Sequence, residues 1–148
     1  MLTTDLERAK DALADDDMLG CVACRTDADG HVEILTGIGR GVRPLLQWLT
    51  TGQRLEGFSA ADRVVGKGAA LLYARLGVHA VYAQTMSEAG LATLRKHNIE
   101  ASCDVLVPMI LNRTHTGKCP IERSVAAIDD PVKAEIAIRA AVAELMRR

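Results

Sequence analysis

The segment Val78–Gln84 most constrains how this chain can fold. It carries apolar side chains at both alternating sets of positions, which is typical of a strand buried on both faces of a parallel sheet. Gly77 directly precedes it and suits the position that ends a helix. Ser87 follows it and can cap the first turn of another helix. A buried strand between two helices predicts an α/β fold.

The segments on either side extend this pattern. Met18–Thr26 and His31–Thr36 predict two strands joined by a turn, which is a β-hairpin. We expect one domain over residues 1–148, with its core at about 19–125, a mixed sheet that begins with the hairpin, and helices on both faces in a three-layer α/β/α arrangement. The other expected elements are helices from Thr4 to Leu13 and at 42–50, 59–76, 87–97 and 130–147, and a strand at 101–107.

Composition limits the partners of this chain. Its 148 residues include 18 basic and 19 acidic side chains, for a net charge of -1, so no strong field attracts nucleic acid or an anionic membrane. No apolar run approaches the roughly 20 residues of a membrane span, and the first residues lack the basic and apolar regions of a signal peptide. We therefore expect a cytoplasmic protein without membrane or nucleic-acid partners, whose four cysteines are thiols.

Short motifs between about residues 19 and 125 occur in a specific order. They are Ala61–Lys67, Met86–Ser87, Val107–Pro108, Asn112–Arg113 and Cys119–Glu122. Together they resemble a family of small microbial proteins of unknown function with a cytidine-deaminase-like fold. The segment from Ser59 lies where deaminases place their H-x-E helix, and the segment from Val81 lies where they place a strand and the P-C-x-x-C helix. The resemblance implies that fold and a pocket at these two helix starts.

The chain differs from the deaminase motifs at the residues that would bind zinc. A zinc deaminase binds its metal through one His or Cys on the first helix and two Cys on the second, with a Glu as proton shuttle. Asp62 or a near neighbour takes the first ligand position here, and the residues from Met86 to Ala89 include no cysteine. The resemblance therefore implies the fold and the pocket location without a metal, a cofactor or deamination.

Asp62 and Lys67 are candidates at the first of these helix starts. Asp62 either forms a capping box with Ser59 or places a carboxylate at the pocket mouth, where it can act as a base. Lys67 lies between Gly66 and Gly68, and each glycine within a helix costs about 1 kcal/mol relative to alanine. Close helix packing or a closely bound ligand can offset that cost, so Lys67 is either a ligand's cation or a solvated side chain.

Ser59 and Ser87 are expected to begin two neighbouring helices at the carboxyl ends of strands. Helix starts in that position can bind a phosphate or a carboxylate, so both serines are ligand-binding candidates besides being caps. Asn112 either presents a polar group to the same pocket or holds its own loop. We expect the ligand to be small and anionic or nucleotide-like.

Cys119 is the candidate nucleophile. Lys118, Arg113 and His115 are close to it in sequence, and neighbouring cations lower the pKa of a thiol. The alternative is an inert packed cysteine. Glu122 is either a general acid or base or a carboxylate at a helix start.

Three functions follow from these candidates. The first is a small-molecule enzyme that has lost deamination, with Cys119, Glu122 and Asp62 as catalytic residues and Lys67 and Ser87 completing the pocket. The second is a protein that binds or senses a ligand in the same pocket without turnover. The third is a metal-dependent deaminase with unusual ligands. The Ala-rich C-terminal helix can pack on its own sheet or form an interface in a homo-oligomer.

Overall fold

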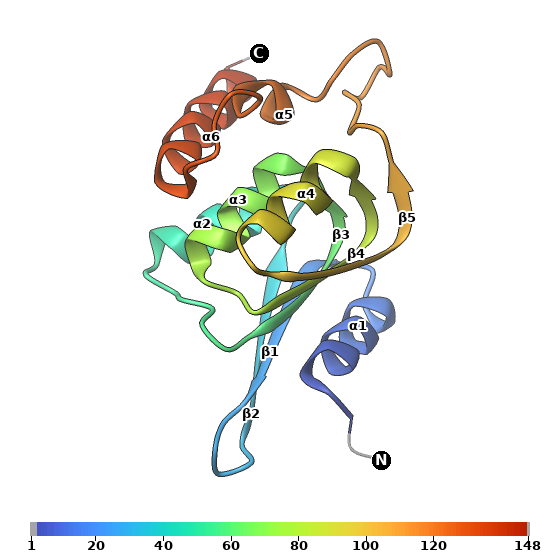
Figure 1. Cartoon of the computed structure of the whole chain (residues 1–148), viewed down its shortest axis with the longest axis vertical. Coiled ribbons are helices and arrows are strands. Elements are labelled where there is room, and N and C mark those ends of the chain that lie inside the picture. The colour runs from blue at the N-terminus through green and yellow to red at the C-terminus, as the bar shows by residue number, and fades with distance from the viewer. Residues whose placement is uncertain (1–2, 148) are drawn as a thin grey trace.

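A computed structural model describes residues 3–147 of the chain; residues 1, 2 and 148, which belong to the expected domain, lie outside the described part. Helices and strands alternate through most of the chain (Figure 1). The elements are α1 (Asp5–Asp15), β1 (Leu19–Thr26), β2 (Val32–Ile38), α2 (Arg43–Thr50), β3 (Ser59–Val65), α3 (Lys67–Leu76), β4 (Ala80–Ser87), α4 (Glu88–Lys96), β5 (Glu100–Val107), α5 (Pro120–Ser124) and α6 (Pro131–Met146).

The five strands form one mixed sheet in the order β2-β1-β3-β4-β5. Strand β1 is antiparallel to both β2 and β3, whereas β3, β4 and β5 are parallel to one another. Helices α3 and α4 connect the parallel strands, as crossover connections require. The predicted α/β fold with a leading hairpin and a mixed sheet is therefore confirmed.

Helices cover both faces of the sheet, as predicted. Helix α1 lies on one face, where its buried Ala9 and Leu13 pack against Val22, Ala61 and Tyr82. Helices α2, α3 and α4 lie on the other face, and α5 and α6 lie outside them (Figure 1). The predicted C-terminal helix is confirmed, and it packs on α3 rather than on the sheet.

The segment Ser59–Val65 is a strand, so the prediction of a helix over 59–76 is wrong for its first half. The strand occupies the centre of the sheet, between β1 and β4. Ala60 and Ala61 are fully buried on its two faces, where small side chains let helices approach the sheet from both sides. Tertiary packing therefore overrides the low strand propensity of alanine. Gly66 ends the strand and precedes α3, which begins at Lys67.

Two smaller features lie outside the predicted elements. Helix α5 forms where the sequence predicted neither a helix nor a strand, with Pro120 at its first position. The short apolar piece from Met109 contributes only an isolated bridge between Leu111 and Lys118. Within the described part of the chain, no helix combines the length and apolar character that a membrane crossing requires.

The cysteines are free thiols, as expected. Cys21 and Cys24 on β1 belong to the cores on opposite faces of the sheet. They are therefore two separately packed thiols, since residues three apart on a strand point in opposite directions.

Candidate functional site

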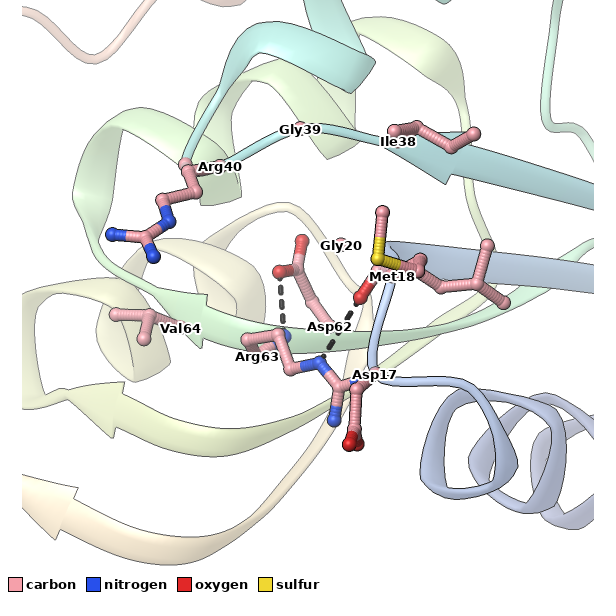
Figure 2. A pocket seen from close by; sticks show the side chains of 11 residues that line it. Asp17, Met18, Gly20, Ile38, Gly39, Arg40, Asp62, Arg63 and Val64 are labelled. Carbon is pink, nitrogen blue, oxygen red and sulfur yellow. Dashed lines mark hydrogen bonds between the residues drawn. The ribbon is translucent and has the colours of Figure 1, made fainter.

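Three cavities lie along one edge of the sheet, where β3 and β4 end. The largest, of about 560 Å³, contains Asp62 and is bordered by the start of β1 and the end of β2 (Figure 2). A small middle cavity of about 90 Å³ shares Gly41 and Val64 with it. A third, of about 220 Å³, shares Ile110 and Glu122 with the middle one. Ligands of open α/β sheets bind at the carboxyl ends of strands, so this edge is the candidate site.

Asp62 projects from β3 into the largest cavity, and only 4% of its surface is exposed. Its Oδ2 accepts a hydrogen bond from the Tyr73 hydroxyl at 2.6 Å, and its Oδ1 accepts one from the Arg63 backbone N–H at 2.7 Å. Burial raises the pKa of Asp62 from 3.8 to about 6, although both hydrogen bonds oppose that shift. A carboxyl group with this pKa can gain or lose a proton near neutral pH.

Glycines allow the two strands that border this cavity to come close together. A Cβ atom on Gly20 would lie 2.2 Å from the carbonyl oxygen of Gly39, so only glycine fits at the irregular start of β1. Gly39 and Gly41 both adopt positive φ angles, which glycine adopts without steric cost. The loop between β2 and α2 can therefore turn sharply at the cavity rim and place Arg40 there (Figure 2).

The two arginines of the largest cavity have different roles. The Arg63 guanidinium donates to the carbonyl oxygens of Leu13, Asp16 and Leu19, at 2.8, 3.0 and 3.1 Å. These bonds satisfy carbonyl groups at and beyond the end of α1, so Arg63 is committed to the structure. The Arg40 side chain is exposed and has no hydrogen bond or ion pair with any residue of the described chain. Arg40 is thus available to a ligand.

The walls of this cavity are partly apolar. Met18 and Ile38 are more than 70% exposed, and Val64 is 40% exposed. Large apolar side chains that remain exposed around a concave, polar floor are typical of a binding site. The cavity therefore combines an apolar wall, a buried carboxylate and a free cation.

The predicted pocket at the helix starts corresponds to the third cavity, where the structure brings Lys67, Ser87 and Glu122 together. Ser87 caps α4 as predicted, because its Oγ accepts from the Gly90 backbone N–H at 2.9 Å. Glu122 binds the start of α3, where Lys67 N–H and Gly68 N–H donate to its two oxygens at 2.7 and 2.8 Å. The sequence predicted a ligand anion at a helix start at Ser59, whereas the helix begins at Lys67 and an internal carboxylate occupies its start.

The glycines around Lys67 are explained by this carboxylate. A Cβ atom on Gly66 would lie 2.2 Å from Glu122 Oε1, and one on Gly68 would lie 2.9 Å from the Ile121 side chain. Close packing of α5 therefore requires glycine at both positions. The Lys67 ammonium points to the loop between α5 and α6. It donates to the carbonyl oxygen of Ala126 at 3.1 Å and pairs with an Asp129 oxygen at 3.3 Å.

The other candidates are spread over different places. Cys119 lines the middle cavity together with Glu122, whereas Asp62 lies in the neighbouring one. Ser59 lies at the opposite end of β3 and begins no helix, so its predicted cap with Asp62 is wrong and its ligand-binding role has lost its basis. Asn112 holds its own loop, because its Oδ1 accepts from the Thr116 backbone N–H at 3.0 Å.

Sequence reasoning missed Arg40, Tyr73 and Met18. The run of glycines at 37, 39 and 41 was a signal for a sharp loop around Arg40. No local pattern distinguishes Tyr73 from an ordinary core tyrosine, because its partner Asp62 lies on another element.

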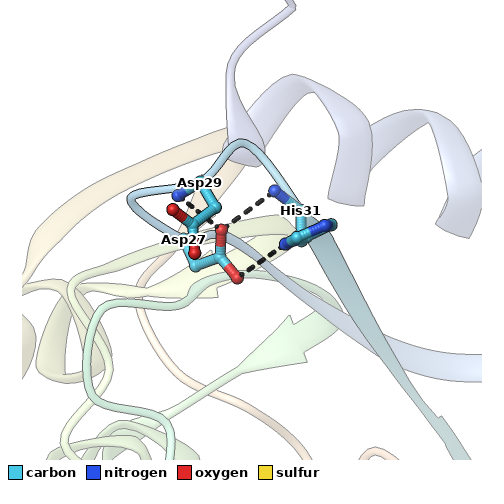
Figure 3. A group of neighbouring side chains, drawn as sticks. All are labelled: Asp27, Asp29 and His31. Atoms are coloured by element: carbon cyan, nitrogen blue, oxygen red, sulfur yellow. Dashed lines mark hydrogen bonds and ion pairs between the residues drawn. The ribbon is translucent and has the colours of Figure 1, made fainter.

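The described residues contain one group that could hold a metal ion, and it lies far from this edge. Asp27, Asp29 and His31 are exposed in the hairpin turn (Figure 3). Asp27 Oδ1 accepts from the backbone N–H groups of Asp29 and His31, both at 2.9 Å. These bonds are those of an Asx turn and explain the cluster as part of the hairpin.

At the candidate site, Cys119 is the one His or Cys side chain among the described lining residues, so the three ligands of a deaminase-type zinc do not fit there.

The fold and the cavity edge define a small α/β protein with a mixed five-stranded sheet and a crevice of mixed polar and apolar lining where its parallel strands end. A family model described as a domain of unknown function (DUF1893) matches residues 7–142, and the chain belongs to this family. This agrees with the predicted resemblance to a family of unknown function. The crystal structure of a DUF1893 family protein, TM1506 from Thermotoga maritima, is similar with a TM-score of 0.75.

The two chains are 22% identical, and the alignment covers 97% of this chain and 92% of TM1506. At that identity the similarity shows a common fold alone. None of the curated proteins matches this chain.

Proposed function

We propose that this protein binds a small nucleotide-like or phosphorylated ligand in the Asp62 cavity. The observation that carries the proposal is a buried carboxylate on the floor of the largest cavity, with the unpartnered Arg40 at its rim. We further propose that the architecture is cytidine-deaminase-like, since a hairpin leads into parallel strands joined by α3 and α4. A binding site at the carboxyl ends of those strands is consistent with that interpretation.

Each part of the ligand has a matching group in the cavity. Asp62 can accept a hydrogen bond from a ring N–H or an amino group, because a carboxylate has about four lone-pair sites and the protein uses three, for Tyr73, Arg63 and Val64. Met18, Ile38 and Val64 offer apolar surface to a flat ring. Arg40 can bind a phosphate through paired N–H donors. A volume of about 560 Å³ lies within the usual range for small-molecule sites.

The test is thermal unfolding of the protein in the presence of nucleoside 5′-monophosphates, the corresponding nucleosides and sugar phosphates. A ligand that binds only the folded state raises Tm, and at 100 times its Kd it adds about 2.7 kcal/mol to the stability. We expect at least one nucleoside monophosphate to raise Tm more than its nucleoside. No response to any of these compounds would contradict the proposal.

Arg40→Gln should abolish the difference between the monophosphate and its nucleoside, because the phosphate loses its cation. Arg43→Gln is the matched control: Arg43 is also exposed, lies three residues further along, and does not line the cavity. Equal loss of the phosphate effect in both variants would indicate general electrostatic attraction instead of a site.

An enzyme that turns over the same ligand is the second candidate function. The raised pKa of Asp62, which burial causes, favours it, because a general base works best when its pKa is near the working pH. Incubation of the protein with any monophosphate that raises Tm, followed by chromatography of the compound, distinguishes an enzyme from a binding protein. Consumption of the compound indicates an enzyme, and its unchanged recovery indicates a binding protein.

A further inference from the structure

Tyr73 is a buried residue that lies below the candidate site without lining it. It projects from α3 toward β3 and is fully buried. Its hydroxyl donates to Asp62 Oδ2 at 2.6 Å, and it also hydrogen-bonds to the Cys21 side chain on β1. Burial raises the pKa of Tyr73 and the pKa of Cys21 well above their ordinary values, so both groups remain protonated and can donate. The three side chains form one chain of hydrogen bonds across the core.

The groups around Asp62 come from five parts of the molecule. One of them, Asp17 between α1 and β1, is a second carboxylate that lines the same cavity. Cys21 lies on β1, Tyr73 on α3, and Arg40 at the cavity rim in the loop after β2. From β3 itself, the Arg63 N–H donates to Oδ1 and the Val64 backbone also hydrogen-bonds to the carboxylate, while the Arg63 guanidinium is bound to carbonyl groups near α1. Tyr73 is thus the one side chain of the described residues with a direct hydrogen bond to the Asp62 carboxylate.

We propose that Tyr73 is the positioning residue of the candidate site. Its hydroxyl holds Oδ2 from below, while the backbone N–H groups of Arg63 and Val64 also bind the carboxylate. The rotation of the carboxylate is therefore fixed, and one of its roughly four lone pairs is left for the cavity. The same bond favours the ionised carboxylate, because a donor stabilises negative charge on its acceptor. This proposal rests on the proposed function, since it assigns Asp62 as the group that binds the ligand.

Tyr73→Phe tests this role directly. The substitution removes the hydroxyl and keeps the ring, so the ionised form of Asp62 loses a donor. Titration of the Asp62 carboxyl carbon by NMR, in the protein without ligand, should show a midpoint roughly one pH unit higher than in the unmodified protein. An unchanged midpoint in a folded variant would overturn the proposal.

Tyr82→Phe is the matched control. Tyr82 is the other tyrosine of the chain, and its hydroxyl also donates to a carboxylate, that of Asp104. That pair involves Tyr82 in the core on the α1 face, whereas Tyr73 belongs to the core on the opposite face. Removal of the Tyr82 hydroxyl should leave the midpoint of Asp62 unchanged, and an equal shift in both variants would count against a specific role of Tyr73.

A second measurement covers the case in which Tyr73→Phe does not fold. In the Tyr82→Phe protein, 3-fluorotyrosine labels Tyr73 alone and makes its hydroxyl a stronger donor. The Asp62 midpoint should then fall, and a midpoint that stays constant or rises would contradict the proposal.

Binding of the nucleoside monophosphate that raises Tm separates this proposal from the proposed function. If both hold, the pH at which that compound's affinity falls by half moves upward in Tyr73→Phe together with the Asp62 midpoint. A shifted midpoint without binding by any compound supports the position of Tyr73 and refutes the proposed function. Binding with a pH profile that Tyr73→Phe leaves unchanged refutes the role of Tyr73 alone.

Discussion

Two buried carboxylates, Asp62 and Glu122, interact with their surroundings in different ways. Asp62 accepts hydrogen bonds from one hydroxyl and from the backbone N–H groups of Arg63 and Val64, and it faces a cavity. Glu122 accepts two backbone N–H groups at the start of α3, where the partial positive charge of the helix also favours an anion. Glu122 therefore fits a structural role, whereas the Asp62 position trades stability for a buried functional group that faces a cavity.

Asp62→Asn should stabilise the protein at neutral pH. The folded-state pKa of Asp62, raised by burial to about 6, exceeds the ordinary value of 3.8, so the folded protein holds a proton that the unfolded chain releases between those pH values. Stability from this group is complete below pH 3.8, falls as the pH rises, and is lost above 6. We expect Asp62→Asn to raise the free energy of unfolding by about 1–2 kcal/mol at pH 7 and by little at pH 4.

Urea unfolding at pH 4 and pH 7, followed by the fluorescence of the single tryptophan, Trp48, measures this difference. A variant that is destabilised equally at both pH values would show that the carboxylate carries no net cost in the fold.

Gly66→Ala should destabilise the protein through Glu122. The new Cβ would lie 2.2 Å from Glu122 Oε1, and the φ of -102° at Gly66 is open to any residue, so contact with Glu122 is the main obstacle. We expect a loss of about 1–3 kcal/mol, but almost no further loss when alanine replaces Gly66 in a protein that already carries Glu122→Ala. Urea unfolding of the two single variants and the double variant measures the coupling; equal costs of Gly66→Ala in both backgrounds would exclude Glu122 as the cause.

At the scale of elements, β3 shows what a local pattern could not predict. Ser59 and Asp62 stand three residues apart before an Ala-rich stretch, as in a helix cap, yet the segment is the central strand. Alanine suits that strand because helices pack closely on both of its faces. Those helices come from distant parts of the sequence, so the local pattern does not reveal them. Elements with an independent local signal were predicted. The helix expected from Thr4 begins with a capping box there, Ser87 caps α4 as expected, and Asp130 caps the helix expected over 130–147.

The candidate site was predictable to a similar extent. The sheet edge followed from the carboxyl ends of parallel strands, and the structure brings Lys67, Ser87 and Glu122 together there. The partner of Glu122 was not predictable, because Lys67 and Glu122 are 55 positions apart and three elements, β4, α4 and β5, lie between α3 and α5. The same long-range packing places the Glu122 carboxylate at the start of α3, where it takes the place of a ligand anion.

At the scale of the whole molecule, α5 and α6 complete the core of the domain. Ala134 and Ile138 of α6 are fully buried in the same core as Trp48 of α2 and Tyr73 of α3. Arg139 also donates to the carbonyl oxygen of Leu46 in α2 at 3.3 Å. The C-terminal helix therefore belongs to the cooperative unit that holds Asp62 in place.

Ile138→Ala should destabilise the whole domain by about 2–5 kcal/mol, because a buried isoleucine leaves a cavity where α6 meets α3. Urea unfolding followed by Trp48 fluorescence and by far-UV circular dichroism should give coincident transitions, since α6 unfolds together with the rest. Ile136→Ala on the same helix is the control: Ile136 is 67% exposed, so its truncation should change stability by less than about 0.5 kcal/mol. Loss of helical signal before any change in Trp48 would show that α6 detaches independently, and the candidate site would then be held by the sheet and α3 without its help.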